Sequence, residues 1–116
     1  MELNKLNLLF NKFKQKYNIN SDTDPEILRV SLFAEEIGEL ADLINLKFSL
    51  TKRNKDIPID LNDKILDELC DILFLVIGTC NLYNYDLEKG LLKLHKKIND
   101  RIKNNINPTL HEHKEE

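Results

Sequence analysis

Two pairs of acidic residues share one spacing and lie among apolar residues. Glu36 and Glu39 occur in "AEEIGEL", and Glu68 and Asp71 occur in "DELCD". A separation of three residues places both acids of a pair on adjacent turns of one helix face. An advance of about 100° per residue puts each pair within the arc that otherwise carries leucine, isoleucine and phenylalanine. The pattern therefore directs four carboxylates toward an expected core.

Carboxylates that lie together in apolar surroundings need a neutralising partner, because burying an uncompensated charge is strongly unfavourable. The neighbouring core-facing positions are mostly leucine, isoleucine and phenylalanine, which leaves a hard divalent cation as the better candidate. Mg²⁺, or alternatively Mn²⁺, prefers oxygen ligands and commonly bridges carboxylates to substrate phosphates. Zn²⁺ is disfavoured because no histidine or cysteine accompanies the acids at ligand spacing. The alternative is an exposed groove lined by acids.

Helices must position these acids, because apolar residues recur at three- and four-residue steps along most of the chain. We expect Asp24 and Asp60 to cap the second and third helices, with Pro25 at the first position of the second. The expected helices span about residues 2–17, 24–50, 60–83 and 86–107. The basic stretch "TKRNKDIP" between the second and third is an expected loop. The chain is thus predicted to form one all-α, four-helix bundle-like domain over residues 1–107, followed by a disordered tail at 108–116.

The composition favours a soluble globular protein. The chain has 116 residues, of which 41% are hydrophobic and 32% charged, with a net charge of −3. This balance is too apolar for a disordered chain and gives no indication of nucleic-acid binding. No apolar run approaches the length of a transmembrane helix, and "MELNKLNLLF" lacks a signal-peptide pattern, so we expect a cytoplasmic protein that does not bind membranes.

One helical segment is apolar on every side. The stretch "ILFLVIGTC" offers no polar face to solvent. A helix of this kind must be enclosed by other helices or by a second chain. We therefore expect a homodimer or a homotetramer built as a dimer of dimers.

The order of the two acidic motifs resembles the MazG-like family of all-α nucleoside triphosphate pyrophosphohydrolases. Their pattern is ExxE, a spacer and then ExxD, matched by "EEIGEL" and "DELCDILF". The resemblance continues through "YNYDLEKGLLKLHKKINDR" and covers residues 26–102, about two-thirds of the chain. It implies hydrolysis of an NTP or dNTP between the α and β phosphates, which yields the monophosphate and pyrophosphate.

The same resemblance implies roles for individual acids. The four residues of the paired motif become Mg²⁺ ligands: Glu36, Glu39, Glu68 and Asp71. Glu35, just before the motif, becomes the residue that activates the attacking water.

Basic residues near the end of the fourth expected helix correspond to the phosphate-binding pair of the family. Lys97 and Arg101 are four residues apart and share a face, so both can reach one polyphosphate. Many relatives carry Lys-x-x-x-Asn instead. A shifted register would use Asn99 and place His95 at the lysine position. A solvated pair that stabilises the helix end is a further alternative.

The residues that bind the base remain unidentified. Phe10, Phe13 and Tyr17 have the spacing either of stacking partners or of a helix core. Asn81 and Asn84 could read a base edge, although Asn84 also suits a turn. The basic loop "TKRNK" could cover the phosphates or lie free in solvent.

Three other functions fit parts of the pattern. A phosphoribosyl-ATP pyrophosphohydrolase-like enzyme usually carries a "DLLYH"-type run, whereas this chain has "DILFL" without a histidine. A ferritin-like di-iron protein would need ExxH pairs, which the sequence lacks. A non-catalytic helical module that binds a nucleotide or a partner is the remaining alternative, but such a module has no use for four carboxylates in its core.

Overall fold

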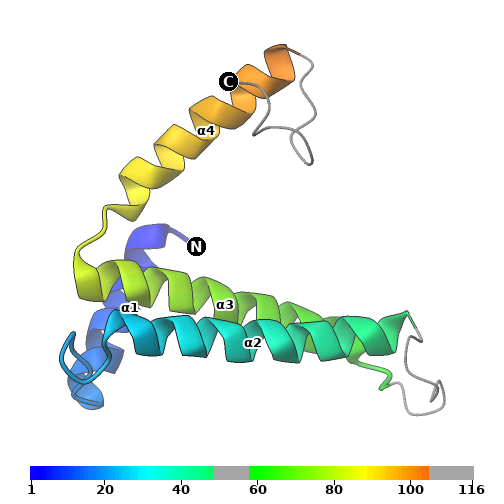
Figure 1. Ribbon diagram of the computed structural model, residues 1–116, viewed down its shortest axis with the longest axis horizontal. Coiled ribbons are helices and arrows are strands. Elements are labelled where there is room, and N and C mark those ends of the chain that lie inside the picture. Colours follow the sequence, from blue (N-terminus) through cyan, green and yellow to red (C-terminus); the bar gives the residue numbers. More distant parts are fainter. Residues whose placement is uncertain (49–57, 105–116) are drawn as a thin grey trace. The chain divides into compact units, whose positions relative to one another are not determined.

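The computed structural model describes residues 1–48 and 58–104, and these residues fold into helices without strands. The helices are α1 (Leu3–Lys16), α2 (Glu26–Lys47), α3 (Leu61–Tyr83) and α4 (Leu87–Lys103), as Figure 1 shows. The predicted all-α class is confirmed for this part of the chain. Most of the expected loop between α2 and α3 and the whole of the expected tail at 108–116 lie outside the described residues.

The chain divides into two compact units. Met1–Tyr85 contains α1, α2 and α3, and Asp86–Glu116 contains α4. Within the first unit, α2 and α3 run antiparallel and side by side, and α1 crosses the end where α2 begins and α3 ends (Figure 1). This helix pair is the scaffold that brings the two acidic motifs of the sequence together.

The core of the first unit is small and lies where α1 crosses the other two helices. Phe10 of α1 and Ile77 of α3 are each 1% exposed. The Phe10 ring centroid lies 5.6 Å from that of Phe74, and the Phe13 centroid lies 5.8 Å from the same ring. Phe10 is therefore a core residue, whereas Phe13 and Tyr17 remain 41% and 58% exposed.

The predicted N-cap of α2 is wrong by one residue. Pro25 occupies the N-cap position and α2 begins at Glu26. The Asp24 carboxylate lies 3.5 Å from Nη1 of Arg29, an arginine that is only 5% exposed. Because a buried guanidinium needs an anionic partner, Asp24 serves the arginine and leaves the helix end without a side-chain cap.

The two later helices begin where the sequence predicts, and the predicted cap position of α3 is confirmed. Asp60 occupies the N-cap of α3, although its carboxylate makes no capping hydrogen bond and lies 4.0 Å from Nζ of Lys64. Asp86 caps α4, since its carboxylate accepts a 3.0 Å hydrogen bond from the Lys89 N–H. α4 ends at Lys103 with Asn104 at its C-cap, and the rest of the expected helix, up to residue 107, lies outside the described residues.

Candidate metal centre

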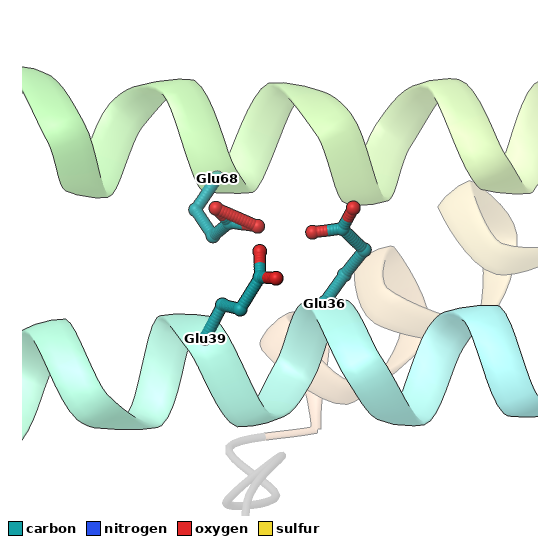
Figure 2. A group of neighbouring side chains, drawn as sticks. All are labelled: Glu36, Glu39 and Glu68. Carbon is teal, nitrogen blue, oxygen red and sulfur yellow. The ribbon is translucent and has the colours of Figure 1, made fainter.

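Three glutamates from two helices converge on one point between α2 and α3. Glu36 and Glu39 extend from α2 toward Glu68 of α3 (Figure 2). Each offers a carboxylate oxygen, and these oxygens lie within 4.8 Å of one another. The i, i+3 spacing in α2 and the antiparallel pairing of the helices produce this convergence, as the sequence pattern predicts.

The surroundings of these carboxylates are unfavourable for three negative charges. Glu36 and Glu68 are half-buried, and Glu39 is exposed. Oε2 of Glu36 and Oε1 of Glu68 are buried and have no hydrogen-bond partner among the described residues. The neighbouring Glu36 carboxylate, burial, and the Glu39 carboxylate raise the pKa of Glu68 from 4.5 to about 8, because each disfavours a negative charge on Glu68. The raised pKa shows that the three carboxylates disfavour one another's charged forms.

A hard divalent cation fits these residues. All three donors are carboxylates, which are the ligands that Mg²⁺ and Mn²⁺ prefer. The two orphaned oxygens would gain the partner that they lack, and the exposed Glu39 leaves an open side toward solvent. No histidine or cysteine belongs to this group in the described part of the chain, so the donor set does not favour Zn²⁺.

Two other predicted site residues lie on the same helices but outside the group. Asp71 is one turn beyond Glu68 on α3 and is exposed; Glu35 precedes Glu36 on α2 and is also exposed. A step of three residues rotates the second acid of each pair by about 60° from the first. Glu39 and Asp71 are both exposed, although Glu39 still reaches toward Glu68, and the expectation that both pairs are enclosed by the core is wrong for these two residues. The role of Asp71 as a ligand stays a prediction.

The predicted phosphate-binding pair lies on α4, in the second unit. Lys97 is exposed and Arg101 is half-buried, and their four-residue spacing places them on one face of the helix. The alternative pair of the shifted register, His95 and Asn99, lies in a shallow hollow along the apolar stripe of the same helix. The apolar members of that hollow are Leu91, Leu94, Ile98 and Ile102.

Asn81, one of the candidates for reading a base edge, is engaged between α1 and α3. Its Nδ2 donates to Oδ1 of Asn7 at 2.7 Å and to Oδ1 of Asn11 at 3.0 Å. Its Oδ1 accepts a 2.7 Å hydrogen bond from Nζ of Lys14. Asn84 adopts the left-handed conformation, with φ 58°, and ends α3, which confirms the turn interpretation of this residue.

Arg29 was not among the site residues predicted from the sequence, yet it is the one buried polar or charged residue among those that the structure describes. Its Nε donates to Oγ1 of Thr79 at 3.0 Å, and its Nη2 donates to the carbonyl of Leu75 at 3.3 Å. A signal was available: Arg29 precedes Glu36 by seven residues, so it falls within about 20° of Glu36 on the same apolar face.

These features define an all-helical protein with a carboxylate cluster between two antiparallel helices. The model of the MazG nucleotide pyrophosphohydrolase domain matches residues 26–106, and the chain belongs to this family of hydrolases. The match includes both acidic motifs and extends through α4. No curated protein and no solved structure matches the chain. None of the described helices is long and apolar enough to cross a membrane.

Because the pKa of Glu68 is raised, both the stability of the protein and its stabilisation by Mg²⁺ should depend on pH. Between about pH 4.5 and pH 8, the folded protein holds a proton on Glu68 that the unfolded chain has already released. Stability without metal should therefore fall as the pH rises through this range. A cation must displace that proton, so Mg²⁺ should raise the melting temperature more at pH 8 than at pH 6.

Thermal melts followed by circular dichroism, with EDTA or with Mg²⁺ at each pH, measure both effects. Glu68→Gln should flatten the dependence on pH and remove most of the response to Mg²⁺. Equal Mg²⁺ shifts at the two pH values in the unsubstituted protein would contradict the prediction.

Proposed function

We propose that this protein hydrolyses nucleoside or deoxynucleoside triphosphates between the α and β phosphates, in a reaction that depends on Mg²⁺. The observation that carries the proposal is the convergence of Glu36, Glu39 and Glu68, with two buried oxygens that lack partners. Membership of the MazG family supports a pyrophosphohydrolase reaction. In the proposed reaction, water attacks the α-phosphorus, the bond from that phosphorus to the bridging oxygen breaks, and pyrophosphate leaves.

The proposed roles divide the residues between holding the cation, activating water and binding phosphate. Glu36, Glu39 and Glu68 hold Mg²⁺, and Asp71 joins them when its side chain turns from solvent toward Glu68. When bound, Mg²⁺ supplies Lewis acidity toward the phosphates and the attacking water. Glu35, which is exposed and directly precedes Glu36 on α2, accepts the proton that the water loses. Lys97 and Arg101 contact the polyphosphate.

A nucleotide panel tests the proposal. The purified chain is incubated with NTPs and dNTPs in Mg²⁺, in Mn²⁺ or in EDTA, and monophosphate and pyrophosphate are quantified. We expect equal amounts of the two products, with no turnover in EDTA. Release of orthophosphate without pyrophosphate would contradict cleavage at the α–β bond. No product from any nucleotide would favour a binding module over an enzyme.

We also propose that the protein assembles as a homodimer or homotetramer. Three leucines at steps of three and four residues on α3 remain open to solvent: Leu66, Leu69 and Leu73 are 57%, 48% and 50% exposed. A contiguous apolar stripe of this kind is unfavourable in water and is typical of interfaces.

Sedimentation tests the assembly. The protein should sediment as a multiple of its 13.6 kDa chain, and Leu66→Glu combined with Leu73→Glu should shift it toward the monomer. Ile27→Glu provides a control, because this 78% exposed residue lies on α2 and is not part of the leucine stripe of α3. A monomer at all accessible concentrations in the unsubstituted protein would contradict assembly.

A further inference from the structure

Arg29 joins α2 to α3 in the same helix register as the carboxylate cluster. Arg29 lies seven residues before Glu36 on α2, and Leu75 lies seven residues after Glu68 on α3. The helices are antiparallel (Figure 1), so the hydrogen bond from Arg29 to Leu75 repeats the pairing of Glu36 with Glu68 two turns away, about 10 Å along the helices. One relative position of the helices therefore satisfies both contacts.

The guanidinium of Arg29 is held from several sides. Its Nε and Nη2 donate to Thr79 and Leu75 of α3, at 3.0 Å and 3.3 Å, and its Nη1 lies 3.5 Å from the Asp24 carboxylate. Gly78 provides the necessary room, because a Cβ atom at that position would lie 2.9 Å from Nη2. The planar fork of the arginine thus fits one arrangement of donors and acceptors.

Two tyrosines connect the same ends of the helices. The Tyr83 hydroxyl donates to the Asp24 carbonyl, and the Tyr85 hydroxyl donates to Oε2 of Glu26. Both bonds join the beginning of α2 to the end of α3. The directional contacts between the two helices are therefore concentrated at the end remote from the loop that joins them.

The remaining contacts between α2 and α3 specify position less sharply. The residues surrounding the carboxylates are mainly leucine and isoleucine, and the hydrophobic effect is not directional. A slip of one helical turn, about 5.4 Å, would preserve much of the apolar burial and would separate Glu36 from Glu68. Hydrogen bonds from a buried arginine penalise such a slip, because its donors would lose their partners.

We propose that Arg29 is a positioning residue that fixes the register of α2 on α3 and thereby assembles the metal-binding carboxylates. The inference rests on the proposed function, since it assigns the cluster to a cation. Arg29 does not touch the substrate; it acts through the relative placement of Glu36 and Glu68. Asp24 pairs with the guanidinium, Thr79 accepts a hydrogen bond from it, and Gly78 leaves space for it.

Binding of Mn²⁺ alone, measured by electron paramagnetic resonance without nucleotide, tests the metal site. Arg29→Met should weaken Mn²⁺ binding by at least tenfold, and Arg29→Lys, which keeps the charge but not the fork, should give an intermediate affinity. Arg29→Met leaves Asp24 without its partner, and losing one member of a buried ion pair is destabilising, so circular dichroism must show that the variant is folded at the temperature of the binding measurement. Arg29→Met combined with Asp24→Asn removes both charges, is expected to be closer to neutral for stability, and should show the same loss of Mn²⁺ affinity. Ile77→Ala is the control: it truncates a buried residue of α3 and lowers the denaturation midpoint, yet it should preserve Mn²⁺ affinity. Wild-type affinity in Arg29→Met would overturn the proposal.

A distance measurement tests the register without reference to metal. Nitroxides are attached at Asp42→Cys and Lys64→Cys, both exposed positions, after the free cysteines are replaced by Cys70→Ser and Cys80→Ala. We expect one narrow distance in the protein with Arg29, and in Arg29→Met a second population displaced by about one turn, ~5.4 Å. An unchanged distribution in Arg29→Met would overturn the proposal. If the wild-type protein neither binds Mn²⁺ nor hydrolyses nucleotides, the proposed function fails, and this distance still decides whether Arg29 fixes the register.

Discussion

Replacing either Glu36 or Glu68 with glutamine is expected to reduce kcat/KM for nucleotide hydrolysis by at least about 100-fold. Mutating a residue that only hydrogen-bonds to a metal ligand typically lowers metal affinity or activity by about 10–100-fold, and losing a ligand itself should cost at least as much. Each substitution removes a carboxylate with a buried oxygen that has no other partner in the described structure. Glutamine keeps the size of the side chain and relieves the repulsion within the cluster. The variants should therefore stay folded and should become more stable than the wild type in EDTA.

Asp42→Asn is the matched control for these substitutions. Asp42 is exposed on α2, six residues after Glu36, and its replacement changes the net charge by the same amount. Its activity should remain within about twofold of the wild type, because surface charges away from a site have small effects. Initial rates over a range of Mg²⁺ concentrations, with helical content followed by circular dichroism, separate loss of the site from loss of the fold. Full activity in Glu36→Gln or Glu68→Gln would show that the cluster does not hold the catalytic cation.

The helices could be predicted from the sequence because their apolar periodicity is strong and their boundaries carry Pro25, Asp60 and Asp86. The ends were less predictable. Asp24 precedes Pro25 in the pattern of an N-cap, yet its carboxylate pairs with Arg29. The ion pair with Arg29, five residues later, competes with capping for the Asp24 carboxylate. Capping preferences do not predict this ion pair, because it depends on the burial of Arg29.

The candidate site could be predicted in outline from the same periodicity. Two acid pairs on apolar faces required a common neutralising partner, and Glu36, Glu39 and Glu68 do converge. The sequence did not predict which acid of each pair is the more exposed, because that depends on how α2 and α3 pack against each other. Glu39 and Asp71 lie at the edge of that contact and are exposed.

Arg29 shows what periodicity alone does not reveal. One arginine on an apolar face has the same pattern as a residue that extends its long side chain to solvent. Its burial depends on the missing side chain at Gly78 and on hydrogen bonds to the Thr79 hydroxyl and the Leu75 carbonyl, all of which come from another helix. Only the assembled helices bring these partners to the guanidinium.

Gly78→Ala is expected to destabilise the first unit by about 1–3 kcal/mol, the usual effect of overpacking a filled core. A Cβ atom at this position would lie 2.5 Å from Cε1 of Phe10 and 2.9 Å from Nη2 of Arg29. Neither neighbour can yield easily, because Phe10 is 1% exposed and the guanidinium is held by Thr79 and Leu75. The clash thus outweighs the gain of up to about 1 kcal/mol that alanine normally provides over glycine in a helix.

Gly38→Ala is the control that isolates the clash, since a Cβ atom at Gly38 of α2 would meet nothing within 4 Å beyond its chain neighbours and the local backbone of its own helix. This substitution should stabilise the protein by about 0.5–1 kcal/mol through helix propensity alone. Urea unfolding of both variants gives opposite signs if close packing at Gly78 decides the result. Phe10→Leu should recover part of the loss in Gly78→Ala, and a double-mutant cycle measures that coupling. If Gly78→Ala is as stable as Gly38→Ala, α1 does not pack against α3 as described. In that case the close fit that encloses Arg29 would be absent as well.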